Sequence, residues 1–227
     1  MLHIKNSPRV HDMIGSKFGG TIEDAVEDSV ENAVEDTICF STNRLMIRDH
    51  LESDLMDLAS LISSEKEMHF LMDIYAPDLE AVRENLKTAM DAVNAPFRDK
   101  YFFAIIEKAT GKYVGEIGFT VIDKTDQLEG NSGALLVELG YFIKSEFRGR
   151  GYVVEAAHEV IRFAFNTLNT HKIMTGCVKE NVGSEKVMLK LGFIKEGELR
   201  QHQLVFGEWK DRVLYGLLKS EYLQNNR

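Results

Sequence analysis

The chain has 227 residues, of which 44% are hydrophobic and 28% charged, enough for one packed α/β domain with an appendage. Its formal net charge of -9 argues against nonspecific nucleic-acid binding through a basic surface. No apolar run approaches the roughly 20 residues that span a bilayer, and no secretion signal is visible, so we expect a cytoplasmic protein. Two cysteines, Cys39 and Cys177, indicate neither a disulfide framework nor a metal site.

The first segment, residues 1–36, is an acidic N-terminal extension with eight acidic and three basic side chains. Its apolar residues recur every fourth position from Ile22 to Val34, which is typical of a narrow stripe along a helix. Two interpretations remain open. The segment is a surface helix or a disordered acidic tail, or it is a helix that docks on a partner or on the rest of the chain.

From Thr37 onward, strand-like and helix-like patterns alternate. We expect helices over 51–63, 77–93, 152–168 and 182–191. We expect strands over 38–40, 45–47, 101–106, 113–122, 135–143, 173–178, 193–205 and 209–218. This order predicts one α/β (α+β) domain over residues 37–227, with a single mixed sheet of about seven strands flanked by helices.

A phosphate-binding loop is predicted where the strand ending at Ile143 leads into the helix that begins near Tyr152. The intervening Arg148-Gly149-Arg150-Gly151 combines two cations with two glycines that allow a ligand to approach the backbone closely. The first N–H groups of a helix lack intrahelical partners and lie at its positive end, so they bind anions. The sequence therefore predicts a pyrophosphate cradle at 148–151.

Two other phosphate-binding motifs are excluded by the sequence. No GxGxxG follows a strand, and no GxxxxGK[ST] occurs, so neither a dinucleotide fold nor a P-loop is indicated. An isolated RGRG would be a surface turn more often than a cradle. The surrounding residues decide between the two interpretations.

The chain resembles the GNAT N-acetyltransferases, and more narrowly the RimJ/RimL-like group that acetylates N-termini of ribosomal proteins. Arg148 and Gly151 match the superfamily signature Gln/Arg-x-x-Gly-x-Gly/Ala, from which Val153 departs at the last position. Other blocks similar to the group are Thr42-Asn43-Arg44-Leu45, Asn181-Val182-Gly183-Ser184, Leu191-Gly192-Phe193, Glu196-Gly197, Asp211 and Tyr215-Gly216-Leu217-Leu218. The resemblance covers roughly residues 37–222.

The resemblance implies that acetyl-CoA lies in a splay between two parallel strands, those ending near Ile143 and Val178. The residues that it assigns to the cofactor are Phe142 and Ile143 for the pantetheine arm, Arg148, Gly149, Arg150, Gly151 and Tyr152 for the pyrophosphate, and Asn181 for the arm. It also implies direct attack of an amine on the thioester, with no covalent enzyme intermediate and no metal.

Two catalytic residues are assigned. Ser184 is expected near the CoA sulfur as a proton donor, although Ser in the first turn of a helix also serves as a cap. Glu138 on the central strand is the first choice for the general base. Glu116, Glu198 and His202 remain alternatives, and removal of the proton through a water chain competes with all four. A regular strand directs Glu138 to the face opposite 139, 141 and 143.

The expected function is transfer of an acetyl group from acetyl-CoA to a primary amine, either a protein N-terminal α-amine or a small molecule. The alternative is a non-catalytic acyl-CoA-binding module with a partner-docking acidic leader. Neither nucleic acid nor membrane is expected as a partner, and a homodimer is compatible with the fold. We expect loops 64–77 and 123–133 to shape the acceptor site.

Overall fold

A computed structural model describes residues 37–124 and 134–225 of the chain. The predicted acidic extension, 1–36, and most of the predicted acceptor loop 123–133 lie outside the described residues. The remaining elements follow the alternation expected from Thr37 onward.

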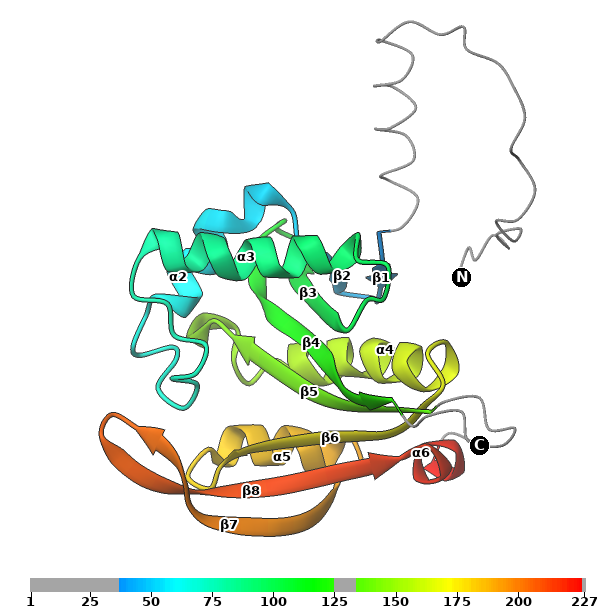
Figure 1. The fold of residues 1–227 in the computed structure, drawn as a ribbon. Helices are drawn as coiled ribbons and strands as arrows, with labels where there is room; N and C mark the ends of the chain where they lie inside the picture. Colours follow the sequence, from blue (N-terminus) through cyan, green and yellow to red (C-terminus); the bar gives the residue numbers. More distant parts are fainter. Residues whose placement is uncertain (1–36, 125–133, 226–227) are drawn as a thin grey trace, which may run out of the picture. The chain divides into compact units, whose positions relative to one another are not determined.

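One mixed sheet of eight strands organises the domain, in the order β1-β2-β3-β4-β5-β6-β8-β7 (Figure 1). The strands are β1 (Cys39–Ser41), β2 (Leu45–Asp49), β3 (Lys100–Glu107), β4 (Tyr113–Lys124), β5 (Leu135–Ile143), β6 (Thr170–Val178), β7 (Ile194–Val205) and β8 (Glu208–Leu218). All neighbours are antiparallel except β5 and β6, which are parallel. All eight segments expected as strands, including the short edge strand β1, join this sheet, so it has one strand more than the sheet of about seven that was expected.

Helices cover both faces of this sheet. They are α2 (Leu55–Ile62), α3 (Leu79–Val93), α4 (Tyr152–Asn166), α5 (Val182–Lys190) and α6 (Lys219–Asn225), with short 3-10 turns η1 (Glu52–Asp54) and η2 (Ser145–Phe147). The helix predicted from residue 51 becomes α-helical only at Leu55, because η1 precedes it. The Asp78 side chain caps α3 by accepting from the Ala81 N–H at 2.9 Å.

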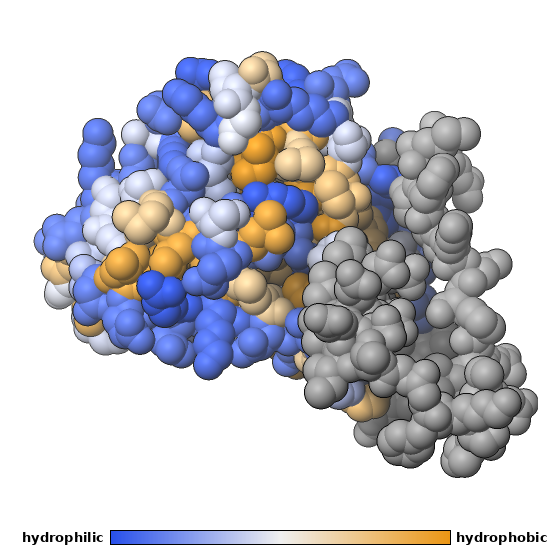
Figure 2. All heavy atoms as spheres, turned by 90° about the horizontal axis from the view of Figure 1, so that it is seen from above, coloured by the Kyte–Doolittle hydropathy of each residue, from blue (hydrophilic) through white to orange (hydrophobic). Residues whose placement is uncertain are grey.

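Two apolar clusters form the core, one on each side of the sheet. Phe103, Ile117 and Phe165 belong to the cluster beneath α4. Leu61 and Leu86 belong to the cluster beneath α2 and α3. Figure 2 views the α2–α3 side from outside and shows mostly hydrophilic residues with apolar patches between them. The clusters fix both helix layers against the sheet, so the strand ends between them are held in place.

The two parallel strands separate halfway along their length. Pairing of β5 with β6 runs from Leu135 to Glu138 on β5 and stops there, although β5 continues to Ile143 and β6 to Val178. The hydroxyl of the buried Thr175 donates to the Leu139 carbonyl at 2.9 Å, next to the last paired residues. The strands then diverge (Figure 1), as the expected splay requires.

Candidate cofactor-binding and active site

A cavity of about 710 Å³ lies where β5 and β6 diverge. Its walls come from the open ends of the two strands, the first turns of α4 and α5, and part of the segment between α2 and α3. Of the residues assigned to the cofactor, it is lined by Phe142, Ile143, Arg148, Gly149, Gly151, Tyr152 and Asn181. The structure therefore brings these separated parts of the sequence to one site.

The loop that enters α4 has the backbone geometry of an anion site. Gly149 and Gly151 have φ values of 76° and 79°, in the left-handed region that side-chain-bearing residues rarely adopt. The first backbone bond of α4 is donated by Glu155 to the Gly151 carbonyl at 3.0 Å. The N–H groups of Tyr152 and Val153 precede that bond, so they lie at the positive end of the helix beside the cavity.

Arg148 and Arg150, which the sequence treats alike, point to different places. Arg148 lines the cavity. The Arg150 guanidinium instead lies 5.3 Å from the Phe147 ring centroid and 3.9 Å from the Glu107 carboxylate, and its residue is not among those lining the cavity. In an irregular loop, tertiary contacts decide where each side chain points. The sequence alone therefore could not predict that Arg148 and Arg150 point in different directions.

Tyr152 is one of the residues that line the cavity, but its hydroxyl forms a hydrogen bond with Glu107. That hydroxyl donates to the Glu107 carboxylate, which also accepts from the Thr110 hydroxyl at 2.6 Å. The Arg44 guanidinium lies 4.5 Å above the Tyr152 ring. These contacts hold the first residue of α4 in place and so stabilise the loop 148–151 that precedes it.

The open edge of β5 presents Phe142 and Ile143 to the cavity. Phe142 is opposite Glu116 on β4, and Ile143 is opposite Gly115. A Cβ atom on Gly115 would lie 2.3 Å from the Phe142 carbonyl oxygen, so only glycine lets β4 approach this closely. The assigned backbone partners of the pantetheine arm are thus backed by a tightly packed strand.

Ser184 and Tyr141 form a hydroxyl pair on the cavity wall. Their oxygens are 2.9 Å apart, and Tyr141 Oη also donates to the Ser184 carbonyl at 3.1 Å. Burial raises the pKa of Tyr141, against a smaller lowering by its hydrogen bond with Ser184, so the phenol keeps its proton at neutral pH. Asn181 caps α5 by accepting from the Ser184 N–H at 3.1 Å. The serine hydroxyl is therefore not needed for the cap. Sequence analysis had no signal for this pairing.

Cys177 borders the same cavity from β6 and is 7% exposed. Burial raises the pKa of its thiol, and hydrogen bonding with Ser184 lowers that pKa by less. A thiol that keeps its proton is a poor nucleophile. Cys177 is therefore not activated as a nucleophile in this structure.

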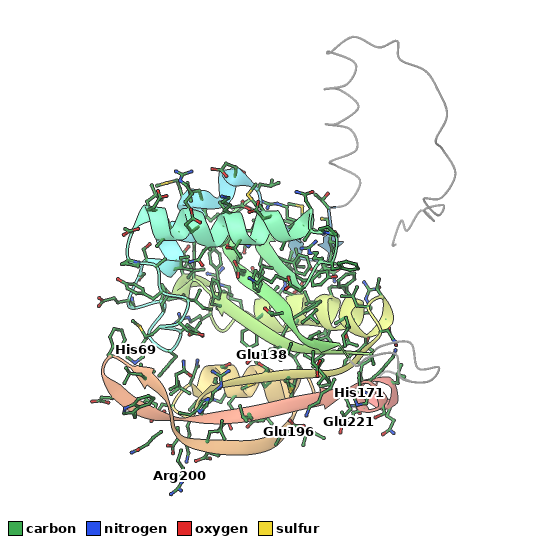
Figure 3. All side chains as sticks on the ribbon, viewed as in Figure 1. His69, Glu138, His171, Glu196, Arg200 and Glu221 are labelled. Carbon is green, nitrogen blue, oxygen red and sulfur yellow. The ribbon has the colours of Figure 1, made fainter. Side chains whose placement is uncertain are left out.

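Three of the four candidate general bases have side chains on exposed parts of strands. They are Glu138, Glu198 and His202. The Glu138 side chain, half exposed, forms an ion pair of 3.1 Å with Arg212 and is not among the cavity-lining residues. Glu198 is bound by Lys179 and Lys195, and His202 is an exposed residue of β7. Figure 3 shows Glu138 near the middle of the sheet, away from His69, which lies beside the tip of the β7–β8 hairpin.

The fourth candidate, Glu116, lies in a buried polar cluster beneath α2. Its Oε2 is 2.9 Å from Nε2 of the fully buried His50, whose Nδ1 is 3.7 Å from Asp54. Burial by itself lowers the pKa of His50, but the interactions with Asp54 and Glu116 outweigh burial and raise it to about 9. The contact with His50 therefore positions Glu116, which lies opposite Phe142 on the neighbouring strand β5.

The segment between α2 and α3 forms the outer wall of the cavity, and the role expected for loop 64–77 in shaping the acceptor site stays a prediction. Lys66, Glu67, His69, Phe70 and Leu71 line it. This wall contacts the tip of the β7–β8 hairpin, where the His69 ring is 5.3 Å from the Phe206 ring and the Gln203 amide donates to the Phe70 carbonyl at 3.4 Å (Figure 3). The sequence indicated the segment but not which of its side chains face the site.

Comparison with known proteins identifies the class. Residues 44–194 match the acetyltransferase (GNAT) domain family. Because this match covers more than half of the chain, the protein belongs to the GNAT acetyltransferase family, whose members use acetyl-CoA. Its sheet, with a parallel pair that diverges beside the phosphate loop, is that family's fold.

Among its relatives, an uncharacterized N-acetyltransferase p20 of Bacillus licheniformis is 35% identical over 120 residues, 53% of this chain and 63% of that protein. The [ribosomal protein uS5]-alanine N-acetyltransferase of Escherichia coli is 34% identical over 84 residues, 37% of this chain and 43% of that protein. The solved spermidine N-acetyltransferase of Vibrio cholerae, in complex with CoA and spermine, superposes with a TM-score of 0.66 at 18% identity, covering 80% and 99% of the two chains. The chain thus spans just under two thirds of the first relative's length.

Two further observations concern the described residues alone. Within 37–124 and 134–225, no helix is long and apolar enough to cross a membrane. The same residues contain no group of three or more His, Cys, Asp or Glu side chains that could hold a metal ion.

Proposed function

We infer that this protein transfers the acetyl group of acetyl-CoA to a primary amine in the cavity between β5 and β6. The observation that carries the inference is the coincidence of three features. An unpaired strand edge, a helix N-terminus with two left-handed glycines, and a hydroxyl pair all face one cavity. Each suits a different part of one cosubstrate, namely the amide-containing arm, the phosphates and the sulfur.

The charges around the cavity fit a polyanionic cofactor. Arg148, Lys66, Lys186 and Lys190 line it, against the single carboxylate of Glu67. Cationic side chains together with a helix N-terminus favour phosphate groups. Acetyl-CoA would bring its phosphates to this end, while its arm would bond the backbone of Phe142 and Ile143.

The reaction consists of one addition and one elimination. The lone pair of a neutral amine forms a C–N bond to the thioester carbonyl carbon, and the carbonyl oxygen becomes an oxyanion. The amine then gives up a proton, the C–S bond breaks as the carbonyl re-forms, and the CoA thiolate takes up a proton. The products are an amide and free CoA. Such a step needs a donor for the sulfur and an acceptor for the amine proton.

Ser184 is the proposed donor to the departing thiolate, with Tyr141 behind it. The two hydroxyls share a hydrogen bond of 2.9 Å, and the raised pKa of Tyr141 keeps a proton in the pair. A proton given by Ser184 can be replaced from Tyr141. This role for Ser184 deepens the assignment made from the sequence and adds Tyr141 to it.

Glu138 as the base stays a prediction, and its carboxylate would first have to leave the ion pair with Arg212. Glu116 is also not among the cavity-lining residues and contacts His50, but it is mostly buried and lies opposite Phe142 across β4 and β5, so we prefer it to Glu138. Replacing each by Gln separates them. Loss of turnover at saturating acetyl-CoA should follow from Glu116→Gln, and loss from Glu138→Gln alone would restore the original assignment.

For the acceptor, we favour the α-amine of a protein N-terminus over a polyamine. Glu67 is the only acidic side chain among the described residues that line the cavity, so little favours a multiply charged cation there. An α-amine also has a pKa of about 7.7–8.0, against about 10.4 for an alkylamine such as lysine, so more of it is neutral at pH 7. The Escherichia coli relative is named for an alanine N-terminus and the Vibrio cholerae neighbour for spermidine, so both are tested below.

The test is thiol release from acetyl-CoA with a panel of amines. It contains an alanine-initiated peptide, the same peptide with a blocked N-terminus, spermidine and lysine. We expect acceleration by the free peptide alone. Acceleration by spermidine would reverse the acceptor preference. Binding of acetyl-CoA without acceleration by any amine would instead support the non-catalytic acyl-CoA-binding module.

A further inference from the structure

The cofactor's arginine already has an anionic partner inside the protein. Arg148 Nη2 is 2.7 Å from Glu67 Oε2, and the same carboxylate oxygen accepts from the Ser145 N–H at 3.0 Å. Arg148 also donates to the Glu67 and Ile143 carbonyls, each at 3.4 Å. Glu67 is thus bonded to a guanidinium and a backbone N–H beside the phosphate loop, which is the donor set that a phosphate would use.

We propose that Glu67 is an internal competitor for Arg148, which the phosphates of the cofactor displace, and that this exchange couples cofactor binding to the acceptor wall. The inference rests on the proposed function, because it takes the cavity to be the acetyl-CoA site. It adds a specificity-determining residue that lies 81 positions before Arg148 in the sequence.

The exposures of the two side chains suit an exchangeable contact. The Glu67 side chain is 13% exposed, but that of Arg148 is 50% exposed. An ion pair with one partner this exposed contributes little to stability, so another anion can replace the carboxylate. Phosphates approaching Arg148 would meet the Glu67 carboxylate at close range, and two anions that share one cation repel each other.

The segment that carries Glu67 connects this exchange to the acceptor side. Its next residue, Met68, is fully buried beneath α2 and α3, and residues 69 and 70 contact the β7–β8 hairpin. Because residues on its C-terminal side are held in this way, release of Glu67 from Arg148 would shift the short segment 66–71. The amine would then contact this segment in one conformation with acetyl-CoA bound and in another without it.

A purely positioning role for Glu67 predicts the opposite sign. If the carboxylate only held Arg148 ready for phosphate, its neutralisation would weaken cofactor binding. If it competes, neutralisation strengthens binding. Glu67→Gln keeps the size and an acceptor oxygen for Ser145 while removing the charge, so it distinguishes the two.

The experiment measures acetyl-CoA affinity by calorimetry in the full chain carrying Glu67→Gln, Arg148→Gln or both changes. We expect Glu67→Gln to tighten binding about fivefold and to have no effect in the Arg148→Gln background. Glu65→Gln, an exposed carboxylate in the same segment that is not a partner of Arg148 in the described structure, is the matched control and should leave affinity unchanged.

Weaker or unchanged acetyl-CoA binding in Glu67→Gln would overturn the proposal. So would an equal tightening when Glu67→Gln is added to the Arg148→Gln variant. A wild-type chain that does not bind acetyl-CoA would instead overturn the proposed function. Hydrogen exchange tests the coupling. Acetyl-CoA should change exchange over residues 66–71 more in the wild type than in Glu67→Gln, and equal changes would exclude the coupling.

Discussion

The first half of the β5–β6 pair and its second half are built from the same two strands but do different work. Residues Leu135 to Glu138 are hydrogen-bonded to β6, whereas Leu139 to Ile143 diverge from it and border the cavity. The paired half fixes the strands relative to each other. The open half has no ladder hydrogen bonds to β6, although the Leu139 carbonyl accepts from Thr175 and the Ile143 carbonyl from Arg148. We propose that the cofactor arm bonds this edge in place of a neighbouring strand.

The largest expected effect concerns the cations at the end of the open half. Arg148→Glu should weaken acetyl-CoA binding about a hundredfold, because it removes a charged partner and adds repulsion beside Glu67. Arg150→Glu is the matched control. Its side chain points to Phe147 and Glu107, so we expect a change of only about threefold. Calorimetry measures both, and equal losses would show that the two arginines share the phosphates.

The next effect concerns the support behind the open half. His50 has a pKa raised to about 9 from 6.5, so its stabilising charge is fully present below pH 6.5 and is lost as the pH rises through 9. We expect the wild type to lose on the order of 2 kcal/mol of unfolding free energy between pH 7 and pH 10 relative to His50→Gln. Urea titrations at the two pH values measure the difference. Parallel pH profiles in both proteins would contradict a charged His50.

Removing the Ser184 hydroxyl should affect turnover rather than binding. Ser184→Ala should lower kcat about tenfold while the KM for acetyl-CoA changes less than twofold, since Tyr141 remains. The cap of α5 uses the backbone N–H of residue 184 and is kept. In the double variant Ser184→Ala, Tyr141→Phe, the loss of kcat should be much smaller than the product of the losses in the two single variants, because the two hydroxyls act together. Steady-state kinetics that show full turnover in Ser184→Ala would remove its donor role.

The smallest effect lies at the junction of the two halves. Thr175→Val removes the donor to the Leu139 carbonyl and should destabilise the fold by about 1 kcal/mol. Ile173→Val in the paired half should destabilise it by a similar amount, about 1 kcal/mol. Only Thr175→Val should also change the acetyl-CoA affinity. If both variants bind acetyl-CoA as the wild type does, the junction does not shape the cavity.

The sequence predicted features that depend on residues close together in the chain better than features that depend on contacts between distant segments. The backbone geometry of the loop that enters α4 was predictable, because Gly149, Gly151 and the first turn of α4 are neighbours in the chain and their geometry is local. The direction of Glu138, opposite to 139 and 141, followed from strand alternation. The eight-stranded order, with β8 between β6 and β7, required the structure itself.

Contacts between distant segments were not predictable from one sequence. Ser184 meets Tyr141 across 43 positions, and Glu138 meets Arg212 across 74. Nothing in the local pattern distinguishes a strand glutamate that pairs with arginine from one that accepts a substrate proton. The family resemblance pointed to Ser184, whose catalytic role stays a prediction, but only the fold reveals the Tyr141 phenol beside it.

Protection of Cys177 tests the central claim, that acetyl-CoA occupies the gap between β5 and β6. The second cysteine, Cys39, is exposed, so the measurement uses a Cys39→Ser chain. The rate of iodoacetamide labelling at Cys177 is followed by mass spectrometry with and without saturating acetyl-CoA. We predict labelling at least about tenfold slower with the cofactor, because Cys177 lines the cavity that the arm would fill. An unchanged rate at saturation would place the cofactor elsewhere and contradict this account.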